Sequence, residues 1–133
     1  MTGAGAPDAS TAAAVLRDHA DDDCIDVTTI GRRSGRAHRV EIWFGLLDDV
    51  VYLISGNGPS ADWYRNALAA GSAVVHVAGV DVPVAATDVT DIDERRRVGE
   101  LMAAKYSWDG DPSIGLTRHA WCYEVPVLAL RPV

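Results

Sequence analysis

Six short segments of this chain place an apolar residue at roughly every second position, and no other feature restricts its fold as strongly. Alternation with a period of two is typical of strands that bury one face. Asp48-Asp49 and Gly79 each separate two such segments and predict two tight hairpins. The expected strands cover residues 24–30, 40–47, 50–55, 72–79, 80–89 and 121–132.

Helical patterns occur at only a few places between these segments. Residues 60–71 predict a helix that begins at Ser60 and stops at Gly71. Residues 90–106 predict a second helix, capped by Asp91. With a short alanine-rich helix nearer the N-terminus, two or three helices are too few to cover both faces of a parallel sheet. The pattern therefore predicts a mainly β fold, a six-stranded antiparallel barrel with helices at its ends.

Length and composition indicate one domain. Residues 11–133 are expected to form it, behind a disordered tail of small residues at 1–10. With 19 acidic and 12 basic side chains, the net charge of −7 argues against nucleic acid or an anionic membrane as the main partner. There is no run of 18 apolar residues, so no membrane span is expected. Two cysteines without close spacing fit a cytoplasmic location.

The segment TTIGRRSGRAHR, residues 28–39, departs from this acidic balance. Four arginines and His38 lie within eight consecutive positions that contain no acid. Gly31 and Gly35 let the backbone curl, so that N–H groups can point at one spot, and Ser34 adds a hydroxyl. Guanidinium groups bind phosphate or carboxylate oxygens in pairs. The segment therefore predicts an anion-binding loop, and the alternative is a solvated loop that offsets surface acids. The four arginines are Arg32, Arg33, Arg36 and Arg39.

A second motif, SGNGPSADWYRN at residues 55–66, runs from a strand through a glycine-rich turn into a helix. The N–H groups at the start of such a helix can bind an anion or a carbonyl group, and the alternative is a tight loop. Trp63 fits either this site or the core. His119 and Cys122 have a spacing that suits a metal, but two ligands do not make a site, so no metal is predicted.

In their order and spacing, TTIGRRSGRAHR, EIWF, LISGNG and DWYRN resemble the deazaflavin-dependent nitroreductase family of the flavin and deazaflavin oxidoreductases. The resemblance covers about residues 24–132 and implies a split β-barrel of the FMN-binding type. It implies coenzyme F420 as cofactor and hydride transfer from F420H2 to a small electrophile such as a quinone, enone or nitro compound. The phosphodiester and polyglutamate tail of F420 would explain a basic loop in an acidic chain. A homodimer is expected, because a second subunit often completes the site in relatives.

The resemblance also implies the site residues. The basic loop would hold the anionic part of the cofactor, two strands would lie along its ring, and the helix after the glycine-rich turn would close the site. The chemistry would be the cofactor's, so no catalytic side chain is predicted. Trp108, in an expected open loop over 107–120, would be the substrate platform. The cofactor-binding residues would be Arg32, Arg33, Ser34, His38, Arg39, Val40, Glu41, Ile42, Trp43, Leu53, Ile54, Ser55, Gly56, Trp63 and Asn66.

Two other functions stay open at this point. The first is a non-enzymatic protein that binds a flavin-like cofactor or a lipid on the same fold. The second is an FMN-dependent oxidase. FMN carries one phosphate and no glutamate tail, and so it needs fewer arginines; Arg36 and Arg39 therefore favour the deazaflavin.

Overall fold

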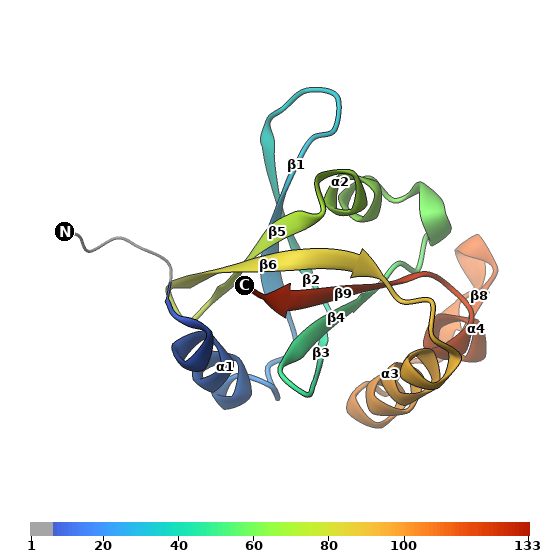
Figure 1. Ribbon diagram of the computed structural model, residues 1–133. Coiled ribbons are helices and arrows are strands. Elements are labelled where there is room, and N and C mark those ends of the chain that lie inside the picture. Colours follow the sequence, from blue (N-terminus) through green and yellow to red (C-terminus); the bar gives the residue numbers. More distant parts are fainter. Residues whose placement is uncertain (1–6) are drawn as a thin grey trace.

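The computed structural model describes residues 7–133 (Figure 1). Most of the expected disordered tail lies outside this range, although residues 9 and 10 already belong to the first helix. None of the helices in the described range is long and apolar enough to cross a membrane. The helices are α1 Ala9–Asp18, α2 Asp62–Ala70, α3 Ile92–Lys105 and α4 Arg118–Tyr123, with short 3-10 turns η1 Gly58–Ser60 and η2 Pro112–Ile114. The strands are β1 Ile25–Ile30, β2 Ala37–Ile42, β3 Gly45–Leu47, β4 Val50–Ile54, β5 Ser72–Val77, β6 Val80–Asp88, β7 Gly110–Asp111, β8 Leu116–Thr117 and β9 Val127–Pro132.

Seven strands form one antiparallel sheet in the order β2-β1-β5-β6-β9-β4-β3, and β7 pairs with β8 separately. The two edge strands, β2 and β3, follow each other in the chain and are joined only by Trp43 and Phe44. Two residues cannot span an open sheet of this width, so the sheet curls until its edges approach at that end. The structure thus fits a split barrel with helices around it, while the expected count of six strands is wrong.

Two expected strands have different bounds. The segment 40–47 is two strands, because the chain leaves β2 at Trp43 and joins the opposite edge as β3; β2 pairs with β1, and β3 pairs with β4. The last strand begins at Val127, and the aromatic residues before it form α4, which packs against α3. Arg95 of α3 donates to the backbone carbonyls of Trp121, Cys122 and Val125, and so stabilises the end of that helix.

The expected turns are confirmed. Asp48 and Asp49 have φ values of 52° and 65°, and Ala78 and Gly79 have 51° and 76°. Left-handed backbone at both positions is the conformation that two-residue hairpins require. Gly71 ends α2 with φ 68°, and the Asp91 side chain accepts from Glu94 N–H at the start of α3. The start of α2 differs from expectation: Ala61 precedes it as the N-cap, and Ser60 belongs to η1.

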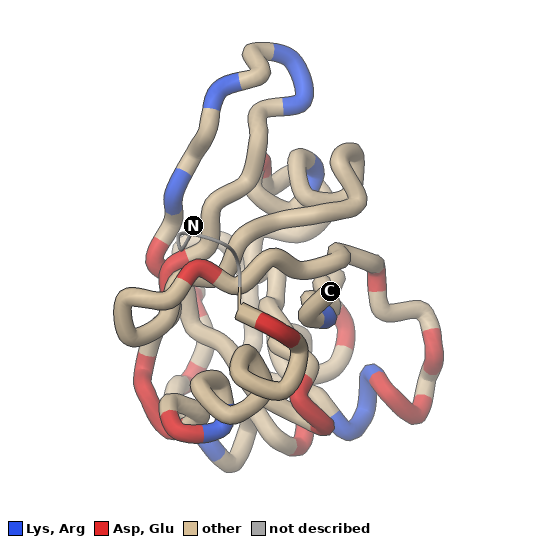
Figure 2. Tube along the Cα trace, turned by 60° about the vertical axis from the view of Figure 1, so that its left-hand side comes forward, with Lys and Arg blue, Asp and Glu red and all other residues tan. Residues whose placement is uncertain are grey.

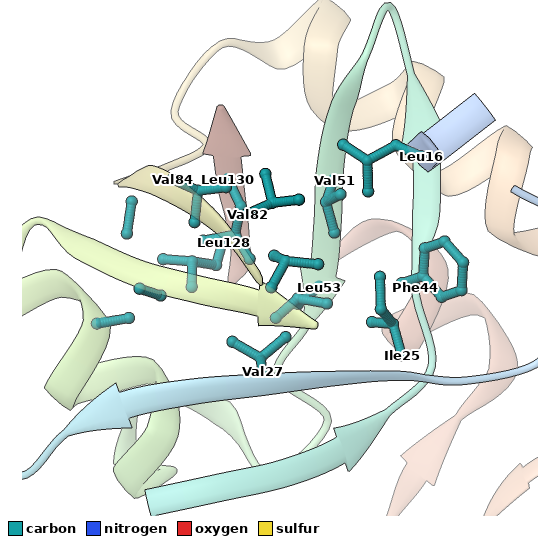
Figure 3. Packing of buried hydrophobic residues seen from close by; sticks show 14 of the residues in the cluster. Leu16, Ile25, Val27, Phe44, Val51, Leu53, Val82, Val84, Leu128 and Leu130 are labelled. Carbon is teal, nitrogen blue, oxygen red and sulfur yellow. The ribbon is translucent and has the colours of Figure 1, made fainter. Parts of the chain in front are cut away.

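Apolar side chains form two clusters on opposite faces of the sheet. The first fills the barrel interior, where Leu16 of α1 and Ala67 of α2 close it (Figure 3). The second lies between the outer face of β4 and β9 and the helices α3 and α4. The side chains of β4 alternate between them, since Leu53 points inward and Ile54 outward. Burial on both faces fixes β4 and β9 as the centre of the domain.

The two-residue link between the edge strands contributes one aromatic side chain to each side of the sheet. Phe44 is buried in the interior, and Trp43 stacks on Tyr106 at 4.3 Å between ring centroids. The Tyr106 hydroxyl accepts from Phe44 N–H at 3.1 Å and donates to the Asp23 carbonyl at 2.7 Å. Lys105 Nζ donates to the Phe44 carbonyl at 2.9 Å. The end of α3 therefore holds the link in place.

Replacing Tyr106 by Phe is expected to lower the free energy of unfolding by about 1–3 kcal/mol, because a buried backbone N–H loses its partner. Burial raises the pKa of Tyr106, so at pH 7 the hydroxyl is protonated and can both accept from Phe44 N–H and donate to the Asp23 carbonyl. Urea titrations at pH 7 measure the loss. Tyr123→Phe is the control, because within residues 7–133 its hydroxyl has no hydrogen-bond partner. Equal effects of the two variants would contradict the role given to Tyr106.

Candidate functional site

A cavity of about 450 Å³ lies between the β1–β2 loop (residues 31–36) and the start of α2. Both segments lie at the same end of the barrel (Figure 1). Seven residues expected at a cofactor site line this cavity together with three that were not. The expected ones are Arg32, Arg33, Ser34, His38, Val40, Trp63 and Asn66, and the others are Thr29, Gly31 and Asp62.

The β1–β2 loop is closed by its own backbone. Gly31 N–H donates to the Arg36 carbonyl at 2.8 Å, and Gly35 N–H donates to the Gly31 carbonyl at 2.9 Å. Gly35 has φ 70°, which favours glycine. At position 31 a Cβ atom would collide with Ser34 Oγ, so a side chain there would displace that hydroxyl. The loop is therefore a defined structure that presents Arg33 and Ser34 to the cavity.

Arg32 joins this loop to α2. Its backbone N–H and its Nη1 both donate to Asn66 Oδ1, at 3.1 and 2.7 Å, and Nη1 also lies 3.3 Å from Asp62 Oδ1. Asn66 is 5% exposed, so its amide oxygen depends on these donors. Arg32 thus positions the wall of the cavity, in addition to any contact with an anion.

Of the other three arginines, Arg39 lies in β2, and Arg33 and Arg36 lie in the β1–β2 loop. Arg39 alternates with His38, so it points to the outer face of the sheet, where its Nε donates to Asp26 Oδ2 at 2.7 Å. Within residues 7–133, neither Arg33 nor Arg36 has an ion-pair partner. Figure 2 shows the basic positions of the loop gathered at one end, while most acidic positions lie over the rest of the molecule. Of these two arginines, Arg33 lines the cavity and is available for an anion bound there.

An apolar wall faces these polar groups. Trp63 is half-buried, packs against the interior cluster and lies edge-on to Tyr64 at 6.1 Å between centroids. Val40 of β2 is half-buried and packs against the same cluster. Trp63 is thus both a core residue and part of the cavity wall, and its role at a cofactor site stays a prediction. A flat apolar group could lie against this wall while its anionic end reaches Arg33.

Thr29 is one of the three lining residues that were not expected at the site. Its side chain is 1% exposed, and its Oγ1 has no hydrogen-bond partner among the residues that the structure describes. Its neighbour Thr28 points to the outer face, where Oγ1 lies 2.7 Å from His76 Nε2, and His76 Nδ1 lies 2.7 Å from Asp81. His76 is thus satisfied at both ring nitrogens, as expected for a structural histidine. The available signal for Thr29 was its place on the inward, otherwise apolar face of β1.

The remaining expected residues do not line the cavity. Glu41 is exposed on the outer face of β2, and Ile42 packs against the interior cluster. At the end of β4, Leu53 and Ile54 belong to the two apolar clusters. Ser55 is buried and donates to the Gly58 carbonyl at 2.6 Å, and Gly56 lies beside Leu116 and Trp121.

Trp43 and Trp108 lie together in an aromatic cluster with Tyr106 and Trp121. Trp108 approaches Trp121 at 5.3 Å between centroids, in an edge-on arrangement. Arg118 donates to the Trp108 and Tyr106 carbonyls at 2.9 and 2.8 Å. The segment 107–120 was expected to be an open loop, but it contains β7, η2, β8 and the start of α4. The substrate role of Trp108 stays a prediction.

The described residues hold no group of three or more His, Cys, Asp and Glu side chains that could bind a metal ion. Of the pair considered from the sequence, His119 lies 3.5 Å from Glu124 and Cys122 is buried in the outer cluster.

Two sequence comparisons bear on these observations. Residues 16–120 match the model of a family described as uncharacterized protein conserved in bacteria, DUF2255. No relative was found among the curated proteins. The family match covers most of the chain, including the loop and the helix that form the cavity.

Several solved structures share the fold. An F420-H2 dependent reductase, FDR-A, is 19% identical with a TM-score of 0.63, over 83% of this chain and 95% of that one. A domain-swapped dimer is 20% identical with a TM-score of 0.62, over 84% and 81% of the two chains. A protein from Listeria innocua, provisionally assigned as a pyridoxamine 5′-phosphate oxidase, is 16% identical with a TM-score of 0.63, over 92% and 91%. At these identities the likeness shows the fold alone.

Replacing Asn66 by Leu is expected to release the β1–β2 loop, because Arg32 loses two hydrogen bonds to one buried acceptor. Hydrogen exchange of residues 31–36 should become faster, and the free energy of unfolding should fall by about 1–3 kcal/mol. Asn66→Asp keeps an acceptor oxygen and is the matched control, with exchange close to that of the wild type. If Asn66→Leu left the exchange of the loop unchanged, Asn66 would not be what holds it.

Proposed function

Because the family match shows that this chain belongs to the DUF2255 proteins conserved in bacteria, whose description gives no activity, we propose a function from the cavity itself. The chain is an F420H2-dependent oxidoreductase that reduces a small electrophile, such as a quinone, enone or nitro compound. The observation that carries this proposal is the cavity in which the unpaired guanidinium of Arg33 faces an aromatic wall. Likeness of fold to an F420-H2 dependent reductase supports it.

The lining residues fit a flat heterocycle with an anionic tail. Arg33 and Ser34 would bind the phosphodiester, since a guanidinium and a hydroxyl both donate to phosphate oxygens. The ring would lie against Trp63 and Val40, which exclude water from one of its faces. When bound, a reduced deazaflavin supplies the hydride, and the protein's part is to hold and orient it. The hydrogen bond between Arg32 and Asn66 would hold the β1–β2 loop at the distance from α2 that cofactor binding requires.

A second candidate, an FMN-dependent oxidase, is favoured by one observation. Arg39 is paired with Asp26 on the outer face and Arg36 does not line the cavity, so Arg33 is the unpaired cation there. One unpaired cation matches the single phosphate of FMN at least as well as a polyglutamate tail. The fold shared with the provisionally assigned pyridoxamine 5′-phosphate oxidase supports this candidate.

The proposal includes a homodimer. Ile30, at the loop end of β1, is 48% exposed, and an exposed apolar side chain favours association. One protein of this fold is a domain-swapped dimer. Multi-angle light scattering should therefore give twice the mass of one chain, and Ile30→Lys should shift the mass toward the monomer. A wild type that stays monomeric at micromolar concentration would contradict this part.

The cofactor is tested by titrating the purified protein with F420, FMN and FAD and following fluorescence quenching. F420 should bind most tightly. Arg33→Glu should weaken binding about tenfold to a hundredfold, because one charge-assisted interaction becomes a repulsion. Bound F420H2, mixed with menadione in a stopped-flow instrument, should then be oxidised in the wild type.

Arg65→Glu is the control for this titration, because Arg65 is exposed on α2, changes the net charge equally and does not line the cavity. An equal loss of F420 affinity in Arg33→Glu and Arg65→Glu would mean that net charge, and not the cavity, governs binding. Tight F420 binding without oxidation by any quinone, enone or nitro compound would leave a carrier protein. Tighter binding of FMN would favour the second candidate.

A further inference from the structure

Two adjacent threonines of β1 differ in whether the side-chain hydroxyl has a hydrogen-bond partner. Thr28 points outward and its hydroxyl is hydrogen-bonded to His76 Nε2 at 2.7 Å. Thr29 points into the cavity, is 1% exposed, and its hydroxyl has no partner within residues 7–133. Buried side-chain hydroxyls in folded proteins nearly always have a partner, since leaving one unpaired is unfavourable. A valine of the same shape would suit this position, as Val27 does on the same face of the strand.

A second polar group lies opposite Thr29. His38 of β2 is its register partner in the antiparallel ladder, and its imidazole lines the same cavity. The part of the structure described here offers no hydrogen bond to the His38 ring. Directly opposed residues of antiparallel strands have their Cβ atoms about 4.5–5.5 Å apart, so one ligand edge can reach both side chains. Between the loop and the wall of Trp63 and Val40 the cavity therefore contains two free hydrogen-bonding groups.

We propose that Thr29 and His38 form a subsite that recognises the polar edge of the bound heterocycle, and that Thr29 sets its specificity. The inference rests on the proposed function, in which Arg33 and Ser34 take the phosphate. The pyrimidine edge of a flavin or deazaflavin alternates carbonyl acceptors with a ring N–H donor. A threonine hydroxyl can donate to the first or accept from the second, and neutral imidazole can do the same. A ligand without such an edge leaves the Thr29 hydroxyl unpaired and is therefore disfavoured.

This arrangement assigns opposite effects to two similar substitutions. Thr29→Val removes an unpaired hydroxyl, so the unfolding midpoint of the ligand-free protein should stay the same or rise. The dissociation constant for the cofactor that binds the wild type, F420 or FMN, should rise about tenfold. Thr28→Val removes a paired hydroxyl, so it should lower the midpoint and leave cofactor affinity unchanged. Thr29→Ser keeps the hydroxyl and should keep most of the affinity.

A second probe separates hydrogen bonding from shape. 8-Anilinonaphthalene-1-sulfonate is flat and anionic but has no carbonyl or ring N–H edge. Its affinity should change less than about twofold in Thr29→Val, because no hydrogen bond is lost. If Thr29→Val weakened the binding of the cofactor and of the sulfonate equally, the substitution would deform the cavity. That result would overturn the subsite.

The outcomes separate the two proposals. If the wild type binds neither F420 nor FMN, the proposed function is wrong. If it binds one of them and Thr29→Val binds it equally well, only the subsite is wrong. If Thr29→Val lowers the midpoint as Thr28→Val does, Thr29 has a structural partner and is no specificity residue.

Discussion

The structure depends on the two residues that connect its edge strands. Trp43 and Phe44 are too short a link for an open sheet, so they enforce curvature, and they place one ring on each face. The backbone N–H and carbonyl of Phe44 are satisfied there by Tyr106 and Lys105 at the end of α3. The contacts that hold this link are therefore also contacts that dock the end of α3. The cavity at the opposite end of the barrel is built on the sheet that this link curves.

The cavity follows from how the other end is closed. β1 and β2 continue past the barrel as a hairpin, and α2 lies across the opening with Tyr64 and Ala67 facing the interior (Figure 1). The space between hairpin and helix has polar groups from the loop on one side and apolar groups from the barrel on the other. The Arg32–Asn66 contact keeps the two apart at a fixed distance. The way in which this end of the barrel is closed therefore produces a cavity with one polar and one apolar wall.

Most local signals were read correctly from the sequence, apart from the N-cap expected at Ser60, and those that depend on distant partners were not. The turns at 48–49 and 78–79 and the cap at Asp91 are set by neighbouring residues, and they lie where expected. The segment 40–47 reads as one strand because nothing in it shows that its halves pair with different strands. Arg39 was grouped with the loop, although alternation along the strand already places the side chains of Arg39 and His38 on opposite faces. The alternation of β1 places Thr29 on its apolar face and Thr28 on the other, but the missing hydrogen-bond partner of Thr29 depends on packing.

An acidic chain can carry an anion site because charges act over a short range in salt water. At physiological ionic strength the screening length is about 8 Å, so a ligand at the loop senses mainly the charges beside it. The loop projects from the end of the barrel, away from most acidic positions (Figure 2). Of its nearby arginines, Arg32 is held by Asn66 and Arg39 by Asp26, and this leaves a local excess of two cations. That excess is small, so charge alone gives modest affinity, and discrimination among anions must come from the short-range contacts deeper in the cavity.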